Sequence, residues 1–180
     1  MIETLILQTP IGLILFRLSE GAVRWVEILP EASTAQPSYL DSVSIFAKEV
    51  ARQVEAYFSG DRNGFSLLID WDEMTDFQAM VLKRVSLLGF GETTSYGKLA
   101  EELSQPGAAR AVGLANSKNP CPLLVPCHRV VAADGAMQGY NAPLGILTKE
   151  WLLRHEGHVI FNHRLVNDQL PLLDLESDFK

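Results

Sequence analysis

The hydrophobic pattern of residues 1–74 consists of short apolar runs separated by turn residues. Proline and glycine interrupt these runs, and runs of this length bounded by such residues are typical of strands. The pattern predicts three consecutive strands, at 5–7, 13–16 and 22–29.

A helical pattern follows the predicted strands. Between residues 43 and 57 apolar side chains recur at helical spacing, with Asp41 or Ser42 as the expected cap and Gly60 as the end. Another short strand is expected at 65–69. This N-terminal part is therefore predicted to be a small sheet-plus-helix domain, and because it holds no chemical motif we interpret it as a scaffold.

From residue 75 the pattern becomes mainly helical. Two of the expected helices are short and flank a glycine-containing turn, which indicates a helix-turn-helix, although any small helical hairpin gives the same pattern. The predicted helices are Thr75 to Leu88 and Ser95 to Leu103, both with a capping residue, Ala108 to Ser117, and one over 149–157 that glycine ends. We predict an α/β (α+β) fold with an N-terminal domain at 1–74, a mainly helical domain at 75–164 and an acidic extension at 165–180.

The charge distribution changes the first impression given by the composition. A net charge of −7 argues against nucleic acid as a partner, because phosphate contacts need Lys and Arg. However, residues 1–74 carry 5 basic and 11 acidic groups, residues 75–164 carry 9 and 7, and residues 165–180 carry 1 and 4. The acidity lies outside the helical part, whose mildly basic character permits DNA binding without demonstrating it.

The sequence also bounds the compartment and the cofactors. No apolar run is long enough to span a bilayer, and no cleavable leader precedes the first strand, so we expect an intracellular, cytoplasmic protein without a membrane partner. Two cysteines, Cys121 and Cys127, are too few to staple a secreted fold. No Cys-x-x-Cys pair suggests a zinc site, so no metal is expected.

One segment concentrates reactive groups. Cys127, His128 and Arg129 are consecutive and lie between two apolar runs. A catalytic cysteine reacts as its thiolate and needs a neighbour that takes or stabilises the proton, a role that His128 could fill. From these residues alone, a small buried thiol beside a core histidine is the more common arrangement.

Further stretches on both sides of this segment form an ordered pattern with it. The stretches are Phe77-Gln78, 91–97, Leu99-Ala100, 110–113, Asn119-Pro120, 126–130, Gly139-Tyr140 and 149–157. Together they cover about half of the chain and resemble the O6-alkylguanine-DNA alkyltransferases, the methylated-DNA–protein-cysteine methyltransferases. The Pro-Cys-His-Arg-Val segment is highly specific to that family.

The resemblance implies a role for each of five catalytic candidates. Cys127 is the expected nucleophile, and His128 is expected to activate it directly or through water. Glu156 is expected to orient the imidazole, as carboxylates do in catalytic triads. Tyr96 is expected to donate its hydroxyl toward the departing base, and Asn119 to brace the backbone of the active site. Without the resemblance, a packed aromatic and an ordinary turn residue are the simpler interpretations of the last two.

The resemblance also implies double-stranded DNA as the partner, approached from the minor groove. Arg110 is expected to enter the duplex and to replace an extruded base. Ala109, Ala111 and Gly113 would let the backbone approach DNA closely, although core packing explains small residues there equally well. Tyr140 completes the expected DNA-binding set. We expect a monomer that needs no cofactor, since the lesion itself is the alkyl donor.

The implied activity is DNA repair by irreversible, single-turnover transfer of the alkyl group from O6-alkylguanine, or also from O4-alkylthymine, to Cys127. The sequence departs from the usual family text at 141–148, which leaves the accepted alkyl group undetermined. Two alternatives remain at this stage. A non-enzymatic, lesion-binding relative would lack a reactive cysteine, and a Cys-His hydrolase would need an oxyanion hole that the sequence does not identify.

Overall fold

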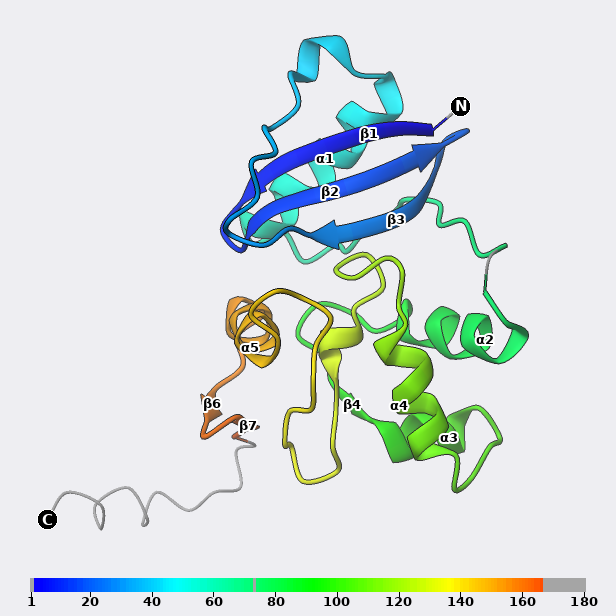
Figure 1. The fold of residues 1–180 in the computed structure, drawn as a ribbon. Coiled ribbons are helices and arrows are strands. Elements are labelled where there is room, and N and C mark those ends of the chain that lie inside the picture. The colour runs from blue at the N-terminus through cyan, green and yellow to red at the C-terminus, as the bar shows by residue number, and fades with distance from the viewer. Residues whose placement is uncertain (1, 73, 167–180) are drawn as a thin grey trace, which may run out of the picture.

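The computed structural model describes residues 2–72 and 74–166. An N-terminal sheet with one long helix packs on a second part made mainly of short helices and loops (Figure 1). The acidic extension predicted at 165–180 lies, from residue 167 onward, outside the described residues.

The sheet confirms the three strands that the apolar runs predict. β1 (Ile2–Thr9), β2 (Gly12–Ser19) and β3 (Ala22–Ile28) form an antiparallel meander in the order β1-β2-β3. Leu5 pairs with Phe16, and Phe16 with Val26, so that three buried side chains lie in one row across the sheet. Such a row of apolar cross-strand neighbours gives the sheet one face to bury.

Helix α1 (Ile45–Phe58) packs against this sheet. The apolar spacing predicts the helix correctly, but the expected cap at Asp41 or Ser42 is wrong. Ser44 caps α1, since its side chain accepts a hydrogen bond from the backbone N–H of Ala47. The earlier positions instead form a separate turn of 3-10 helix, η1 (Leu40–Ser42).

The strand expected at 65–69 is also wrong. Only Ile69 forms a bridge, to Val23, and the edge of β3 is shared between two segments. The N–H of Val23 donates to the carbonyl of Leu68, whereas the N–H of Val26 donates to that of Pro120. Because a loop of the helical part occupies the rest of this edge, 65–69 cannot extend the sheet.

The helical part contains α2 (Asp76–Val85), α3 (Tyr96–Glu102), α4 (Ala109–Ser117) and α5 (Ile146–His155). The predicted caps Thr75 and Ser95 are confirmed, because each side chain accepts an N–H from the first turn of its helix. The pair α3 and α4 packs together around a short connection, as the helix-turn-helix pattern predicts.

Short strand pairs complete this part. β4 (Thr94–Ser95) pairs in parallel with β5 (Val130–Val131), and this pairing brings the start of α3 beside the segment that carries the reactive residues. β6 (Ile160–Phe161) and β7 (Arg164–Leu165) form a small hairpin, so β7 spans the domain boundary expected after residue 164.

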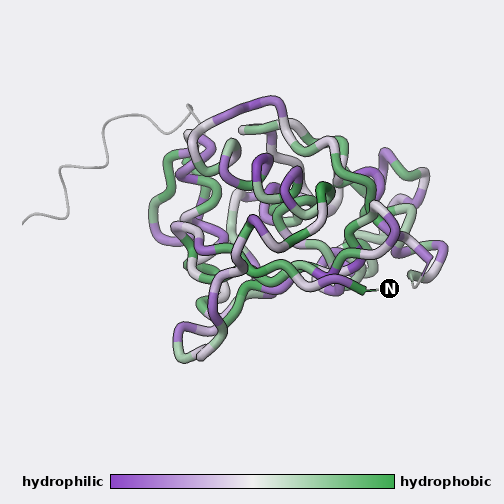
Figure 2. Tube along the Cα trace, turned by 90° about the horizontal axis from the view of Figure 1, so that it is seen from above, coloured by the Kyte–Doolittle hydropathy of each residue, from purple (hydrophilic) through white to green (hydrophobic). Residues whose placement is uncertain are grey.

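The apolar residues of both parts form one main core, whose members include Phe16, Val54, Val81 and Val125. Figure 2 shows apolar and polar stretches alternating along the described part of the chain. Within the described ranges no helix is both long and apolar enough to cross a membrane.

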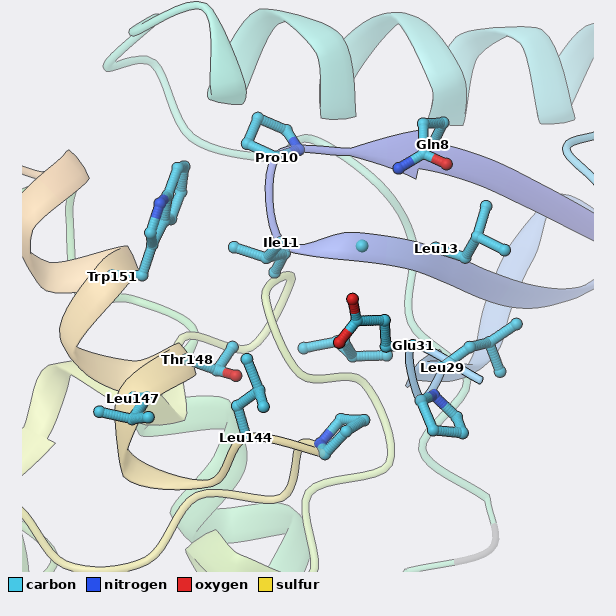
Figure 3. A pocket seen from close by; sticks show the side chains of 14 residues that line it. Gln8, Pro10, Ile11, Leu13, Leu29, Glu31, Leu144, Leu147, Thr148 and Trp151 are labelled. Atoms are coloured by element: carbon cyan, nitrogen blue, oxygen red, sulfur yellow. The ribbon is translucent and has the colours of Figure 1, made fainter. Parts of the chain in front are cut away.

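A cleft of about 620 Å³ separates the two parts on one side (Figure 3). The turn between β1 and β2, with Pro10 and Ile11, faces Leu144, Leu147 and Trp151 across it. The divergent 141–148 segment therefore forms one wall of this cleft.

Candidate active site

The reactive residues lie on a tight, fully buried turn. Pro126 has φ −79° and ψ 63°, the conformation of an inverse γ-turn, and the N–H of Cys127 donates to the carbonyl of Val125 at 2.7 Å. A single turn of 3-10 helix, η2 (Cys127–Arg129), follows directly. The three reactive residues are consequently held together in one small turn.

Two asparagines hold this turn against α4. The amide of Asn119 donates to the carbonyl of Val125 at 2.8 Å, and its oxygen accepts the N–H of Cys121 at 3.0 Å. The amide of Asn116 donates to the carbonyl of Cys127 at 3.3 Å. Asn119 thus has the contacts of the predicted brace, and Asn116 adds a second one that no sequence signal indicated.

The carboxylate of Glu156 is hydrogen-bonded to two of the reactive residues. Its Oε1 lies 2.8 Å from His128 Nε2, and the guanidinium of Arg129 donates to both of its carboxylate oxygens, also at 2.8 Å. Arg129 further donates to the carbonyl of Leu88 at 2.6 Å. The fold therefore joins Glu156 and His128, which are far apart in the sequence and which the resemblance paired.

The protonation states follow from this network. Burial alone would raise the pKa of Glu156, but the hydrogen bonds and charges of His128 and Arg129 hold its pKa well below the ordinary value. Burial lowers the pKa of His128, with Arg129 contributing, although Glu156 opposes this shift. A neutral His128 that donates from Nε2 to a carboxylate leaves its Nδ1 as an acceptor, and this buried Nδ1 has no protein partner.

Cys127 is buried, and its burial raises the pKa of the thiol. Asn119 and the charge of Lys149 act in the opposite direction. Lys149 is itself only 1% exposed and donates to the carbonyl of Val130 at 2.6 Å. Burial lowers the pKa of this lysine to about 8. Its spacing from Leu152 and Leu153 on the buried face of α5 was the one signal that could have identified it.

Two tyrosines lie near the thiol. The ring of Tyr140 stands edge-on to His128 at 6.4 Å between centroids, and its buried hydroxyl has no hydrogen-bond partner. Burial, and then the charge of Cys127, raise the pKa of both Tyr140 and Tyr96. Either hydroxyl therefore stays protonated and is available as a donor.

A groove of about 600 Å³ opens in front of these tyrosines. Predicted site residues that line it are Tyr96, Ala109, Arg110, Gly113 and Tyr140, together with Ser117, Gln138, Gly139 and Asn141. Of the predicted DNA-binding set, only Ala111 does not line the groove; it is exposed on α4. Cys127 does not line it either, since the thiol lies below the surface.

The two cavities differ in chemistry. The slightly larger interdomain cleft has no contact with Cys127, His128 or Glu156, whereas the groove shares Tyr96 and Tyr140 with the surroundings of the thiol. Among the residues that the structure describes, no group of three or more His, Cys, Asp and Glu could hold a metal ion. We therefore take the groove as the candidate substrate site.

Comparison with known proteins agrees with this arrangement. A family model described as 6-O-methylguanine DNA methyltransferase, DNA binding domain, matches residues 76–158. A methylated-DNA–protein-cysteine methyltransferase of Methanosarcina acetivorans is 38% identical over 154 residues, which are 84% of this chain and 96% of that protein. The protein of the same name from Mycobacterium leprae is 37% identical over 89% of this chain and 95% of its own length.

Solved structures show the same fold. The Mycobacterium tuberculosis protein OGT in complex with DNA superposes with a TM-score of 0.71 at 35% identity, covering 84% of this chain and 90% of that one. The O6-methylguanine methyltransferase of the same organism gives a TM-score of 0.72 at 33% identity over 87% and 93%. Since identity and coverage both extend over most of the two chains, this protein belongs to the methylated-DNA–protein-cysteine methyltransferase family.

Proposed function

We propose that this protein repairs double-stranded DNA by transferring an alkyl group from O6 of guanine to Sγ of Cys127. The observation that carries the proposal is the buried His128–Glu156 pair beside Cys127, together with the contact of His128 with Tyr140, which lines the same groove as Arg110. The same site could take O4-alkylthymine, because both lesions present an alkylated exocyclic oxygen.

The chemistry needs a route for the thiol proton. His128 is kept neutral, and its unpaired Nδ1 can accept that proton directly or through one water. The thiolate then attacks the alkyl carbon, so that an S–C bond forms while the C–O6 bond breaks and its electron pair remains on guanine. A hydrogen bond donated by the Tyr96 hydroxyl, on the tyrosine side of the groove, stabilises the negative charge of the departing base, and the base takes up the proton that His128 accepted from the thiol.

The substrate must leave the base stack to reach a buried thiol, at a cost of a few kcal/mol, as in other base-flipping enzymes. Arg110 is exposed at the start of α4 and borders the groove, where its long side chain can fill the gap left by an extruded base. Ala109 and Gly113 keep this surface low enough for a close approach to the minor groove.

The product is a thioether, and no described group near Cys127 offers a way to cleave it. We therefore propose a single turnover per molecule, by a monomer that needs no cofactor and works in a reducing intracellular compartment. A lesion-binding relative without transfer activity remains the alternative, and the presence of a cysteine at the turn argues against it.

Mass spectrometry after incubation with duplex DNA containing O6-methylguanine tests the proposal. One methyl group on the Cys127 peptide, saturating at one per protein, is the expected result. Cys127→Ala should bind the lesion without a mass change, and Cys121→Ala, which removes the other buried thiol, should still react. Binding by the wild type without any mass change would support the lesion-binding alternative, and methylation of Cys127→Ala would show that the nucleophile is misassigned.

A further inference from the structure

The N-terminal part reaches into the active site through one side chain. The hydroxyl of Tyr57, near the end of α1, donates to Oε1 of Glu156 at 2.9 Å, and Tyr57 is only 3% exposed. The sequence of this part indicates only a scaffold role. We propose, on the basis of the function above, that Tyr57 is a positioning residue for alkyl transfer, which fixes the Glu156 carboxylate that orients His128.

The coordination of the carboxylate shows what Tyr57 adds. Oε1 accepts from Tyr57, from His128 and from Arg129, whereas Oε2 accepts from Arg129 and from the N–H of Gly91. Arg129 thus donates hydrogen bonds to both carboxylate oxygens, and His128 donates to one. The Tyr57 hydroxyl is the only donor to Oε1 from the N-terminal part among the described hydrogen bonds, so it adds to the helical part's own donors a restraint on the position of this oxygen.

The charges fix the direction of this hydrogen bond. Glu156 is ionised because His128 and Arg129 outweigh the effect of burial on its pKa. Burial, and then the neighbouring Glu156 charge, raise the pKa of Tyr57 well above its ordinary value. Tyr57 is therefore a protonated donor and Glu156 an ionised acceptor, an arrangement in which the hydrogen bond is strong.

Packing holds the Tyr57 ring independently of its hydroxyl. The rings of Phe58, Phe65, Phe90 and His155 surround it, with centroids 5.1 to 5.9 Å away. His155 Nε2 also lies 2.8 Å from the carbonyl of Tyr57. Phenylalanine at this position would keep every one of these ring contacts and would remove only the hydroxyl, so the positioning role and the packing role can be separated.

The other groups around His128 define the pH effect. Burial lowers the pKa of His128 most, Glu156 raises it, and the charges of Arg129 and Lys149 lower it further. The Tyr140 hydroxyl interacts electrostatically with Tyr57 and Glu156. Without the hydrogen bond from Tyr57, the negative charge on Oε1 of Glu156 interacts more strongly with His128 and stabilises its protonated form more. The acidic limb of the pH–rate profile should therefore move to higher pH, since His128 must be neutral to take the thiol proton.

The test compares Tyr57→Phe with wild type in single-turnover methyl transfer from duplex O6-methylguanine across pH, with thermal unfolding measured alongside. Tyr39→Phe is the matched control, because Tyr39 is 86% exposed. We expect roughly a tenfold lower rate at neutral pH for Tyr57→Phe, with the acidic limb shifted upward, and no change for Tyr39→Phe. A wild-type rate and an unshifted profile for Tyr57→Phe would overturn the inference while leaving the proposed function intact; only absence of transfer by the wild type would count against that function.

A double-variant comparison tests the route through Glu156. If Tyr57 acts through this carboxylate, Tyr57→Phe should have no further effect on the rate in a Glu156→Gln background. An undiminished effect there would overturn the inference. A readout on the wild-type protein does not depend on the variants folding: NMR should show a slowly exchanging Tyr57 hydroxyl proton, and exchange as fast as that of Tyr39 would contradict the proposed hydrogen bond.

Discussion

The imidazole of His128 and the carboxylate of Glu156 form a hydrogen-bonded pair 2.8 Å apart, and neither side chain has any exposed surface. The pair joins a turn at the centre of the helical part to the residue that ends α5. Because Glu156 also neutralises Arg129, one buried carboxylate serves both the orientation of the proposed base and the stability of the fold.

Glu156→Gln should therefore impair both properties. An amide supplies one acceptor oxygen where the carboxylate supplies two, and it leaves the Arg129 charge buried without its counter-ion, which typically costs about 3–5 kcal/mol. We expect transfer to slow by roughly 100-fold or more, since the imidazole loses its fixed tautomer. Urea unfolding and single-turnover kinetics would measure the two effects.

The pH dependence of stability gives a check on the same substitution. The pKa of Glu156 is lower in the folded protein than its ordinary value, so its contribution to stability is present at neutral pH and is lost as the pH falls through the folded pKa. The difference in unfolding free energy between wild type and Glu156→Gln should shrink in acid. A difference that stays constant down to strongly acidic pH would contradict an ionised, paired Glu156.

Arg110→Ala should slow repair of duplex DNA without impairing the chemistry. If Arg110 fills the gap left by an extruded base, its loss raises the cost of flipping, and about 1.4 to 3 kcal/mol corresponds to roughly a 10- to 100-fold slower reaction. The rate with free O6-methylguanine base, which needs no flipping, should not change. Lys98→Ala is the control, since Lys98 is exposed on α3 and does not line the groove. Equal slowing with duplex and free base would instead place Arg110 in the chemical step.

Local signals explain why most of the fold was predictable. The caps Thr75 and Ser95 act within a few residues, and each one marks the helix it was expected to mark. The strand at 65–69 failed because strand pairing is not local. Its place along β3 is taken in part by Pro120, a contact that no short stretch of sequence encodes.

The site residues also separate into those that local sequence or the family resemblance predicts and those that depend on distant contacts. Cys127 and His128 are adjacent in the sequence, and the family resemblance supplied Glu156. The roles of Asn116, Lys149 and Tyr57 depend on contacts across the fold, and the last of these joins residues in different parts of the chain. An asparagine such as Asn116 is usually a surface residue, and a tyrosine such as Tyr57 usually a packing residue. Neither residue type indicates a role in the site, so only the folded structure shows which groups they contact.

Lys149→Met should lower the transfer rate in a pH-dependent way. The positive charge of Lys149 lowers the pKa of the Cys127 thiol, and methionine keeps most of the side-chain volume without that charge. Because burial places the lysine pKa at about 8, wild type should exceed the variant most below pH 8 and should approach it above. A constant ratio from pH 6 to about 10 would show that the charge has no role in the chemistry.

The stability of the wild type relative to Lys149→Met should increase with pH, whereas its advantage in transfer rate should decrease. The lysine pKa falls from 10.5 to about 8 on folding, so the unfolded chain binds more protons between these two values. The free energy of unfolding of wild type, measured relative to Lys149→Met, should therefore rise as the pH increases from about 8 to 10.5. No change over this range would mean that the folded protein holds Lys149 as firmly charged as the unfolded chain does, and a fall would mean that folding raises the pKa of Lys149.

Gly91→Ala should destabilise the protein and slow transfer together. Gly91 has φ +75°, which L side chains rarely adopt, and an added Cβ would lie 3.2 Å from the backbone oxygen of Glu156. Its N–H donates to the Glu156 carboxylate at 3.2 Å, so any shift that relieves the contact also moves the residue that orients His128. We expect a loss of about 1–3 kcal/mol in urea unfolding.

Gly60→Ala separates the two causes. Gly60 has φ +91°, and an added Cβ there would meet no atom within 4 Å. In this variant the left-handed backbone conformation alone should lower the free energy of unfolding, by about 1 kcal/mol, and the transfer rate should stay at the wild-type value. If Gly60→Ala slowed transfer as much as Gly91→Ala, the effect would come from general destabilisation. A slow Gly91→Ala beside an active Gly60→Ala would show that sub-ångström placement of Glu156 limits the reaction.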